Sequence, residues 1–63
     1  MKYRGIEGEV HFNKDMRKFV GELKNTKYLV TFSGRSLNEV VNNFHKSVES
    51  YQNTLNKKST KED

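Results

Sequence analysis

The chain has 63 residues and a net charge of +4, is 32% hydrophobic and 32% charged, and contains no cysteine and no proline. This length permits one domain of marginal stability, and the lack of cysteine excludes disulfide bonds and thiolate zinc sites. No apolar run reaches the roughly 20 residues of a membrane span, and the first ten residues lack the apolar core of a signal peptide. We therefore expect a small cytoplasmic domain with no membrane segment, no cofactor and no metal, stabilised by an oligomer or a partner.

The first half of the chain alternates polar and apolar residues as strands do. Over Ile6–Phe12 the even positions are apolar or glycine and the odd positions are polar, which predicts a strand with one buried face. Turn-forming residues follow at 13–17, and further strands are predicted over Lys18–Leu23 and Tyr28–Phe32. Three short strands joined by short loops predict an antiparallel meander.

The sequence period changes after Gly34. Ser36 and Glu39 have the spacing of a capping box, in which the serine hydroxyl accepts the Glu39 amide hydrogen and the carboxylate returns to the Ser36 amide. Apolar residues then recur at helical spacing and predict a helix from Leu37 to Asn56. These residues are Leu37, Val40, Val41, Phe44, Val48, Tyr51 and Leu55. Residues 57–63 contain no apolar residue and are expected to form a disordered tail after a single domain of residues 1–56.

Together these elements predict an α+β domain in which one amphipathic helix covers one face of a three-stranded antiparallel sheet. Gly8 and Gly21 lie on the same inward face, and two interpretations stay open for them: a close approach of the helix, or a bulge in the strand. The sheet residues expected in the core are Ile6, Val10, Phe12, Phe19, Leu23, Tyr28, Val30 and Phe32.

Glu7, Glu9 and His11 share the outward face of the first predicted strand, on which neighbouring side chains lie about 7 Å apart. Carboxylates at that separation can act as an acid–base pair, but solvated acids on an outer sheet face are far more common. Because no nucleophile or orienting group accompanies them, we expect no catalytic residue and no enzymatic activity. His45 falls at the border of the apolar helix face and is interpreted as a half-buried structural histidine. Two histidines alone cannot close a metal site.

Twelve basic residues are distributed mainly over loops and the C-terminal segment. Only Lys46 lies on the well-formed part of the predicted helix, which therefore lacks the basic face of a major-groove recognition helix. Phe12, Phe19, Tyr28 and Phe32 are assigned to the core, and this leaves no outward aromatic row for base stacking. We expect no sequence-specific DNA binding, while weak contact of the loops with phosphate stays open as an alternative.

A three-stranded meander leaves two open edges, and open edges pair with other chains. The first predicted strand carries no proline and no inward charge to prevent such pairing, and Val20 and Leu29 are apolar residues on the outward face. We therefore expect a homodimer. The candidate self-association or partner surface consists of Ile6, Glu7, Gly8, Glu9, Val10, His11, Val20 and Leu29.

Several motifs, taken in order, resemble the N-terminal domain of HicB-family antitoxins over residues 3–52. They are Tyr3-Arg4-Gly5, Gly8-Glu9-Val10, Phe19-Val20-Gly21-Glu22, Thr31-Phe32-Ser33-Gly34-Arg35-Ser36, Leu37-x-x-Val40 and Phe44-x-x-x-Val48-x-x-Tyr51. The resemblance implies a truncated ribonuclease H-like fold without nuclease activity, in which a further strand follows the helix. It also implies a partner, because HicB-like antitoxins bind and inhibit HicA, a small basic toxin of bacteria that cleaves messenger RNA.

Many HicB-like proteins also carry a C-terminal DNA-binding domain, for which these 63 residues have no room. We expect a minimal or orphan HicB-like antitoxin domain that neutralises a HicA-like toxin, with its open sheet edge at Ile6–Phe12. The alternative function is a small basic domain associated with nucleic acid, or a stand-alone homo-oligomeric domain. The resemblance assigns no toxin-contacting residue.

Overall fold

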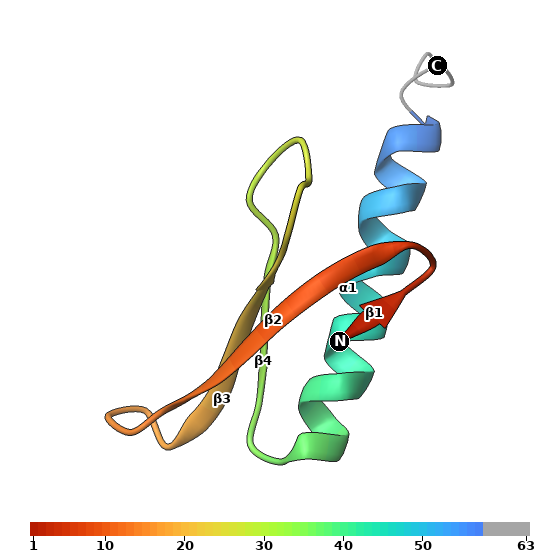
Figure 1. The fold of residues 1–63 in the computed structure, drawn as a ribbon. Coiled ribbons are helices and arrows are strands. Elements are labelled where there is room, and N and C mark those ends of the chain that lie inside the picture. The colour runs from red at the N-terminus through yellow and green to blue at the C-terminus, as the bar shows by residue number, and fades with distance from the viewer. Residues whose placement is uncertain (58–63) are drawn as a thin grey trace.

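The computed structural model describes residues 1–57, with side chains through Leu55. The strands and the helix are β1 (Lys2–Tyr3), β2 (Ile6–Asn13), β3 (Lys18–Leu23), β4 (Thr31–Gly34) and α1 (Leu37–Lys57). The strands form one antiparallel sheet in chain order, and α1 crosses one of its faces (Figure 1). The α+β class is confirmed, whereas the expected count of three strands is one too few.

The additional strand is β1, which pairs with the start of β2 through Lys2 opposite Glu7 and Tyr3 opposite Ile6. Arg4 and Gly5 connect the two strands with φ angles of 53° and 79°. Positive φ at both central residues is the requirement of a two-residue type I′ hairpin turn, which suits the twist of the strands. A strand of two residues is too short to show a period of two, so the sequence pattern could not reveal it.

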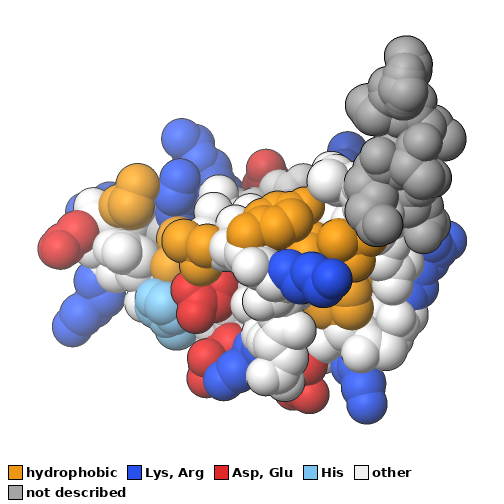
Figure 2. Space-filling view, turned by 90° about the horizontal axis from the view of Figure 1, so that it is seen from above, with side chains coloured by type: hydrophobic (Ala, Val, Ile, Leu, Met, Phe, Trp, Pro, Cys, Tyr) orange, Lys and Arg blue, Asp and Glu red, His pale blue; other side chains and the backbone are white. Residues whose placement is uncertain are grey.

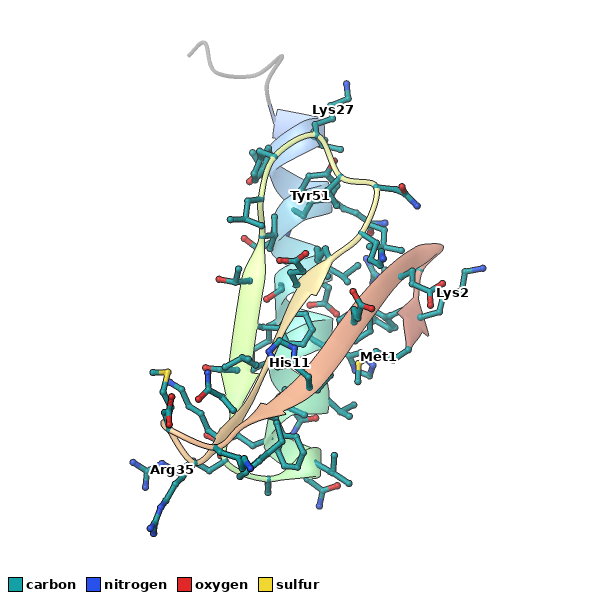
Figure 3. All side chains as sticks on the ribbon, turned by 60° about the vertical axis from the view of Figure 1, so that its left-hand side comes forward. Met1, Lys2, His11, Lys27, Arg35 and Tyr51 are labelled. Carbon is teal, nitrogen blue, oxygen red and sulfur yellow. The ribbon has the colours of Figure 1, made fainter. Side chains whose placement is uncertain are left out.

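The third predicted strand begins too early in the sequence, because β4 starts at Thr31 and not at Tyr28. Side-chain hydrogen bonds hold the preceding residues in a loop. The Thr26 hydroxyl donates to the Tyr28 carbonyl at 2.7 Å, and the Lys27 amide donates to the Tyr51 hydroxyl at 2.8 Å. Figure 3 shows Tyr51 reaching from α1 to the loop that carries Lys27. These contacts replace the ladder bonds that a longer strand would make.

The buried core lies between α1 and the inner face of the sheet. Its residues are Leu23, Phe32, Val40, Phe44, Val48 and Tyr51, with Tyr3, Ile6, Val10, Phe19, Val30, Val41 and Leu55 packed against them. Phe12, Tyr28 and Leu37 were expected in this core but are 50%, 44% and 62% exposed. Phe12 lies near the tip of the β2–β3 hairpin, which projects away from α1 (Figure 1). Tyr28 belongs to the loop before β4, and Leu37 is the first residue of the helix.

Gly8 permits a close approach and does not mark a bulge. The pairing of β2 with β3 is continuous from Gly8 opposite Leu23 to Asn13 opposite Lys18, which leaves no extra residue for a bulge. A β-carbon on Gly8 would lie within 3.0 Å of the Phe44 ring of α1. At Gly21 the close neighbours are the Phe32 ring and a backbone carbonyl of β2, so there the approach comes from within the sheet.

The start of α1 confirms the capping box with one change of partner. The Glu39 amide donates to the Ser36 hydroxyl at 3.1 Å, as expected, but the Glu39 carboxylate accepts from the Arg35 amide at 3.0 Å and not from the Ser36 amide. The helix continues to Lys57, the first residue of the expected tail 57–63, and the rest of that segment lies outside the described residues. Within residues 1–57, no helix combines the length and the apolar character needed to cross a bilayer.

Candidate interaction surface

The face of the sheet opposite α1 contains an open hollow with a volume of about 510 Å³. The side chains of its walls come from three strands: Glu9 and His11 of β2, Val20 and Glu22 of β3, and Thr31 and Ser33 of β4. Met16 and Lys18 extend the walls at the hairpin end. The hollow therefore combines two carboxylates, the Lys18 ammonium group, hydroxyls and an imidazole with apolar surface from Val20 and Met16.

The strand register brings two carboxylates face to face. Glu9 lies opposite Glu22, and Glu22 lies opposite Thr31 in the next strand. The Lys24 amide donates to the Glu7 carbonyl at 2.8 Å, so these two opposite residues form a hydrogen-bonded pair. Such pairs recur at every second residue of an antiparallel ladder, so the odd-numbered residues of β2 bond to β3 and Glu9–Glu22 is also a hydrogen-bonded pair. Their Cα atoms are therefore about 5.5 Å apart, and like charges at that position destabilise a sheet.

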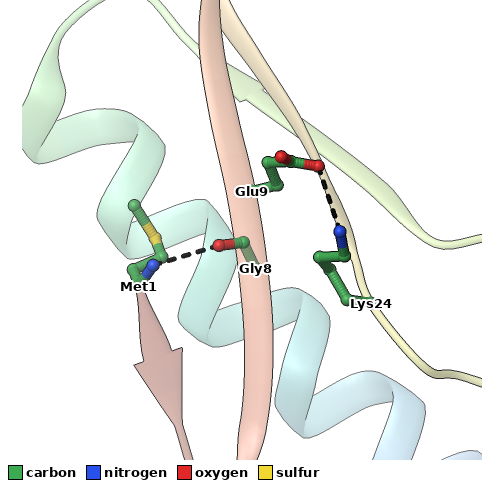
Figure 4. Close-up of polar contacts among 4 residues, drawn as sticks. All are labelled: Met1, Gly8, Glu9 and Lys24. Atoms are coloured by element: carbon green, nitrogen blue, oxygen red, sulfur yellow. Dashed lines mark hydrogen bonds and ion pairs between the residues drawn. The ribbon is translucent and has the colours of Figure 1, made fainter.

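Lys24 partly offsets this repulsion. Its Nζ atom lies 3.5 Å from Oε1 of Glu9 (Figure 4), and the two side chains are 47% and 65% exposed. An ion pair so open to solvent contributes little to stability. Glu22 has no ion-pair partner among the described residues. The Glu9–Glu22 pair thus remains a local concentration of negative charge on a chain whose net charge is +4.

His11 occupies the neighbouring row of the hollow, opposite Val20, which in turn lies opposite Ser33. Within residues 1–57 no group of three or more His, Cys, Asp or Glu side chains is placed to hold a metal ion. The arrangement is suited to receiving a cationic side chain, because two carboxylates can accept its hydrogen bonds while Val20 contacts its aliphatic stem.

The predicted surface residues separate into two groups. Glu7, Glu9 and His11 are exposed on the outward side of β2, as expected, whereas Ile6, Gly8 and Val10 turn their side-chain positions toward the core. Of these three, only Val10 has backbone groups to offer a partner on this edge, because Ile6 pairs with Tyr3 and Gly8 with Met1. Half-buried Val20 contributes to the hollow, but Leu29 is 73% exposed in the loop before β4 and does not line it.

The expectation of an open edge along Ile6–Phe12 is correct only for its second half. β1 pairs with Ile6 and Glu7, and Met1 continues that pairing. The Gly8 amide donates to the Met1 carbonyl at 2.7 Å, and the Met1 amino group donates to the Gly8 carbonyl at 3.0 Å (Figure 4). The part of β2 without a neighbour on this side is therefore the segment 9–13.

The candidate surface predicted from sequence lacks seven of the residues that line the hollow, namely Met16, Lys18, Gly21, Glu22, Thr31, Phe32 and Ser33. The missing information was the register of β2 against β3. It is set by the turn at residues 14–17, where the side-chain oxygen of Asn13 accepts the Met16 amide hydrogen at 3.0 Å. Asparagine at the start of a turn commonly makes this bond, so Asn13 is the sequence signal that could have fixed where the turn begins within the predicted segment 13–17.

A second cluster fastens β1 to α1. The Tyr3 ring stacks on His45 with centroids 4.0 Å apart, and the Tyr3 hydroxyl donates to a Glu49 carboxylate oxygen at 2.9 Å. The Gln52 amide donates to the Arg4 carbonyl at 3.2 Å. His45 is half-buried, as expected, and its contacts with aromatic rings give it a packing role.

The basic side chains do not form one continuous stripe. On the face seen in Figure 2 they are scattered, most at the edges and one near the middle over hydrophobic surface, with acidic side chains between them. Lys14 and Arg17 belong to the hairpin turn, and Figure 3 places Arg35 at the same end of the molecule. Phe12 is exposed close to this end, with its ring 5.2 Å from that of Phe19. The expectation that Phe12 is unavailable for outward contacts is therefore wrong.

No protein-family model matches this chain, and neither a curated protein nor a solved structure matches it.

Proposed function

We propose that this chain is a non-catalytic interaction domain of the HicB antitoxin type, which binds a small basic messenger-RNA-cleaving toxin of the HicA type and blocks its activity. The proposal is supported by the series of motifs that resembles HicB and by an α+β domain in which those motifs lie on consecutive elements. The observation that carries it is the pair of opposed carboxylates, Glu9 and Glu22, in the hollow on the outward face of the sheet, called the acidic hollow below.

The hollow is complementary in charge to a basic protein. Glu9 and Glu22 repel each other across β2 and β3, and a lysine or arginine side chain from a partner removes that repulsion on binding. An arginine can bond carboxylates through two parallel N–H groups. Electrostatic matching of this kind speeds association and selects the partner, while apolar contacts with Val20 and Met16 supply buried area.

The test is co-expression with the product of any small basic open reading frame found beside this chain's gene. We expect that protein alone to arrest growth, and the wild-type chain to relieve the arrest and to co-purify with it. The variant Glu22→Lys reverses charge in the hollow and should lose both effects. A matched control is the double variant N42K/N53K, which changes the net charge equally at exposed positions of α1 and should keep them.

Two results would contradict the proposal. The first is growth arrest that the wild-type chain does not relieve, together with failure to co-purify. The second is equal binding by Glu22→Lys and by the wild type, which would remove the acidic hollow from the interface even if a complex forms. Circular dichroism of each variant establishes that it is folded.

A nucleic-acid-associated role is the second candidate, and the exposure of Phe12 favours it. An aromatic ring beside basic side chains is the combination with which proteins stack and hold single-stranded nucleic acid. Lys14, Arg17 and Arg35 lie at the same end of the molecule as this ring. The measurement is the fluorescence anisotropy of a labelled single-stranded RNA, for which affinity should fall steeply between about 50 and 200 mM salt. A flat salt response, or unchanged binding by Phe12→Ala, argues against this role.

A further inference from the structure

The second half of β2 presents an unpaired edge. β1 pairs only with Ile6 and Glu7, and Met1 satisfies both backbone groups of Gly8. Since odd-numbered residues of β2 bond to β3, the amide and carbonyl groups of Val10 and Phe12 point to the opposite side. No strand of the described chain lies there. Four backbone hydrogen-bonding groups, the amide and the carbonyl of Val10 and of Phe12, are therefore available along this edge.

The other edge of the sheet, along β4, is less available for pairing. The Leu23 amide donates to the Val30 carbonyl at 3.0 Å, so the backbone groups of Thr31 and Ser33 face the outside of β4. The side-chain amide of Asn43 donates to the Ser33 carbonyl at 2.6 Å, and α1 packs mainly against β4. The free segment of β2 is consequently the better place for another strand.

We propose that a second copy of this chain pairs with the free segment of β2, so that the two β2 strands run antiparallel about a two-fold axis at His11. This inference is independent of toxin binding. The register follows from the available groups. Met1 blocks Gly8 and the turn begins after Asn13, so full pairing can use only Val10 and Phe12. Each Val10 must then lie opposite the partner's Phe12, which places His11 opposite the partner's His11.

The side chains suit this register. On the inner face, Phe12 is 50% exposed in the single chain and becomes covered by the partner's Val10. On the outward face, Glu9 lies opposite the partner's Asn13, so no like charges meet there. No proline and no inward-facing charge interrupts the segment 9–13, although natural edge strands commonly carry such residues to prevent pairing.

The segment is complementary to itself in this register, which supports a copy of the same chain as the occupant. Val10 and Phe12 meet on the inner face, and Glu9 meets an uncharged Asn13 on the outward face, on both sides of the two-fold axis. The helices leave room, because the hairpin projects away from α1 (Figure 1) and α1 packs mainly on β4. The dimer is one continuous sheet with both helices on the same face and both acidic hollows on the other.

The absence of cysteine from the chain allows a direct test. In the proposed register the two residues at position 11 form a non-hydrogen-bonded pair with Cα atoms about 4.5 Å apart, within reach of a disulfide. We expect His11→Cys to form a covalent dimer rapidly under mild oxidation. The matched control Glu9→Cys, on the same strand and face, should not, because the two sulfur-bearing residues are offset by four positions, about 13 Å. Cross-linking of Glu9→Cys or of Thr31→Cys in preference to His11→Cys would overturn the proposal.

The oligomeric state of the uncross-linked full chain provides the second measurement. Light scattering at high micromolar concentration should give the mass of a dimer, and a monomer would overturn the proposal. Phe12→Lys places a charge on the paired edge and should weaken the dimer at least about tenfold. The control Leu37→Lys also replaces an exposed apolar residue by lysine, at a position that is 62% exposed on α1, and should leave the dimer intact. A folded Phe12→Lys variant that dimerises like the wild type would also overturn it.

Discussion

Phe44 lies directly over Gly8, so that the ring of a fully buried helix residue rests on strand backbone. The same ring contacts Phe32 at a centroid distance of 5.3 Å and the edge of Tyr3 at 6.5 Å. One glycine thereby allows a single aromatic side chain to join the helix to β1, β2 and β4. The separation of α1 from the sheet depends on the missing side chain at position 8.

Gly8→Ala should therefore destabilise the domain, because its methyl group would occupy the space of the Phe44 ring. Overpacking of this kind costs about 1–3 kcal/mol in the free energy of unfolding, measurable by urea denaturation. Glu7→Ala is the neighbouring control and should change stability by less than about 0.5 kcal/mol, because Glu7 is exposed. The double variant G8A/F44L should cost less than the sum of the two single changes. Strict additivity would show that ring and glycine do not interact.

The contact of Tyr3 with α1 predicts a graded response. Tyr3→Phe removes the hydrogen bond to Glu49 but keeps the ring on His45, and should cost about 0.5–1.5 kcal/mol of unfolding free energy. Tyr3→Ala also removes the packing and should cost about 1–2 kcal/mol more. Tyr28→Phe is the control, since Tyr28 is 44% exposed, and it should be nearly neutral. Equal effects of Tyr3→Phe and Tyr3→Ala would mean that the stacked ring contributes nothing.

The fold was predictable from sequence where a pattern extends over many residues. The helix shows its apolar face over five turns, and its predicted limits differ from those of α1 by one residue at one end only. The strand pattern at Tyr28 is just as apolar, yet hydrogen bonds from Thr26 and to Tyr51 hold that segment in a loop. The bond to Tyr51 depends on a residue 24 positions away in the sequence, which a local pattern cannot reveal.

The sequence predicted which face of the sheet carries the candidate surface, but it did not predict the hollow on that face. The alternation of polar and apolar residues along β2 correctly placed Glu7, Glu9 and His11 on the outward face of the sheet. The opposition of Glu9 and Glu22 depends on how β2 and β3 are aligned, and that alignment is set by four turn residues whose position the sequence left uncertain. β1 covers half of the expected open edge, because a two-residue hairpin turn lies between Tyr3 and Ile6.

The opposition of Glu9 and Glu22 makes a prediction about stability with a definite sign. Glu22→Gln removes one of two like charges and should raise the unfolding free energy by about 0.2–1 kcal/mol at low salt. The gain should shrink at about 1 M salt, where charge interactions are screened over a few ångströms. Glu7→Gln is the matched control. Because Glu7 lies opposite Lys2, removing its charge should leave the free energy of unfolding unchanged or lower it slightly. Destabilisation by Glu22→Gln at low salt would contradict the repulsion.

The two serines at positions 36 and 50 should respond to alanine with opposite signs. Ser36 accepts the Glu39 amide hydrogen at the start of α1, and Ser36→Ala leaves that amide without its protein partner, at a cost of about 1 kcal/mol. Ser50 is exposed within the helix, where alanine is the better helix former, so Ser50→Ala should raise stability by a few tenths of a kcal/mol, roughly. Thermal and urea unfolding of both variants provide the measurement. A stabilising Ser36→Ala would show that the capping hydrogen bond does not contribute to folding, because helix propensity alone would then account for both changes.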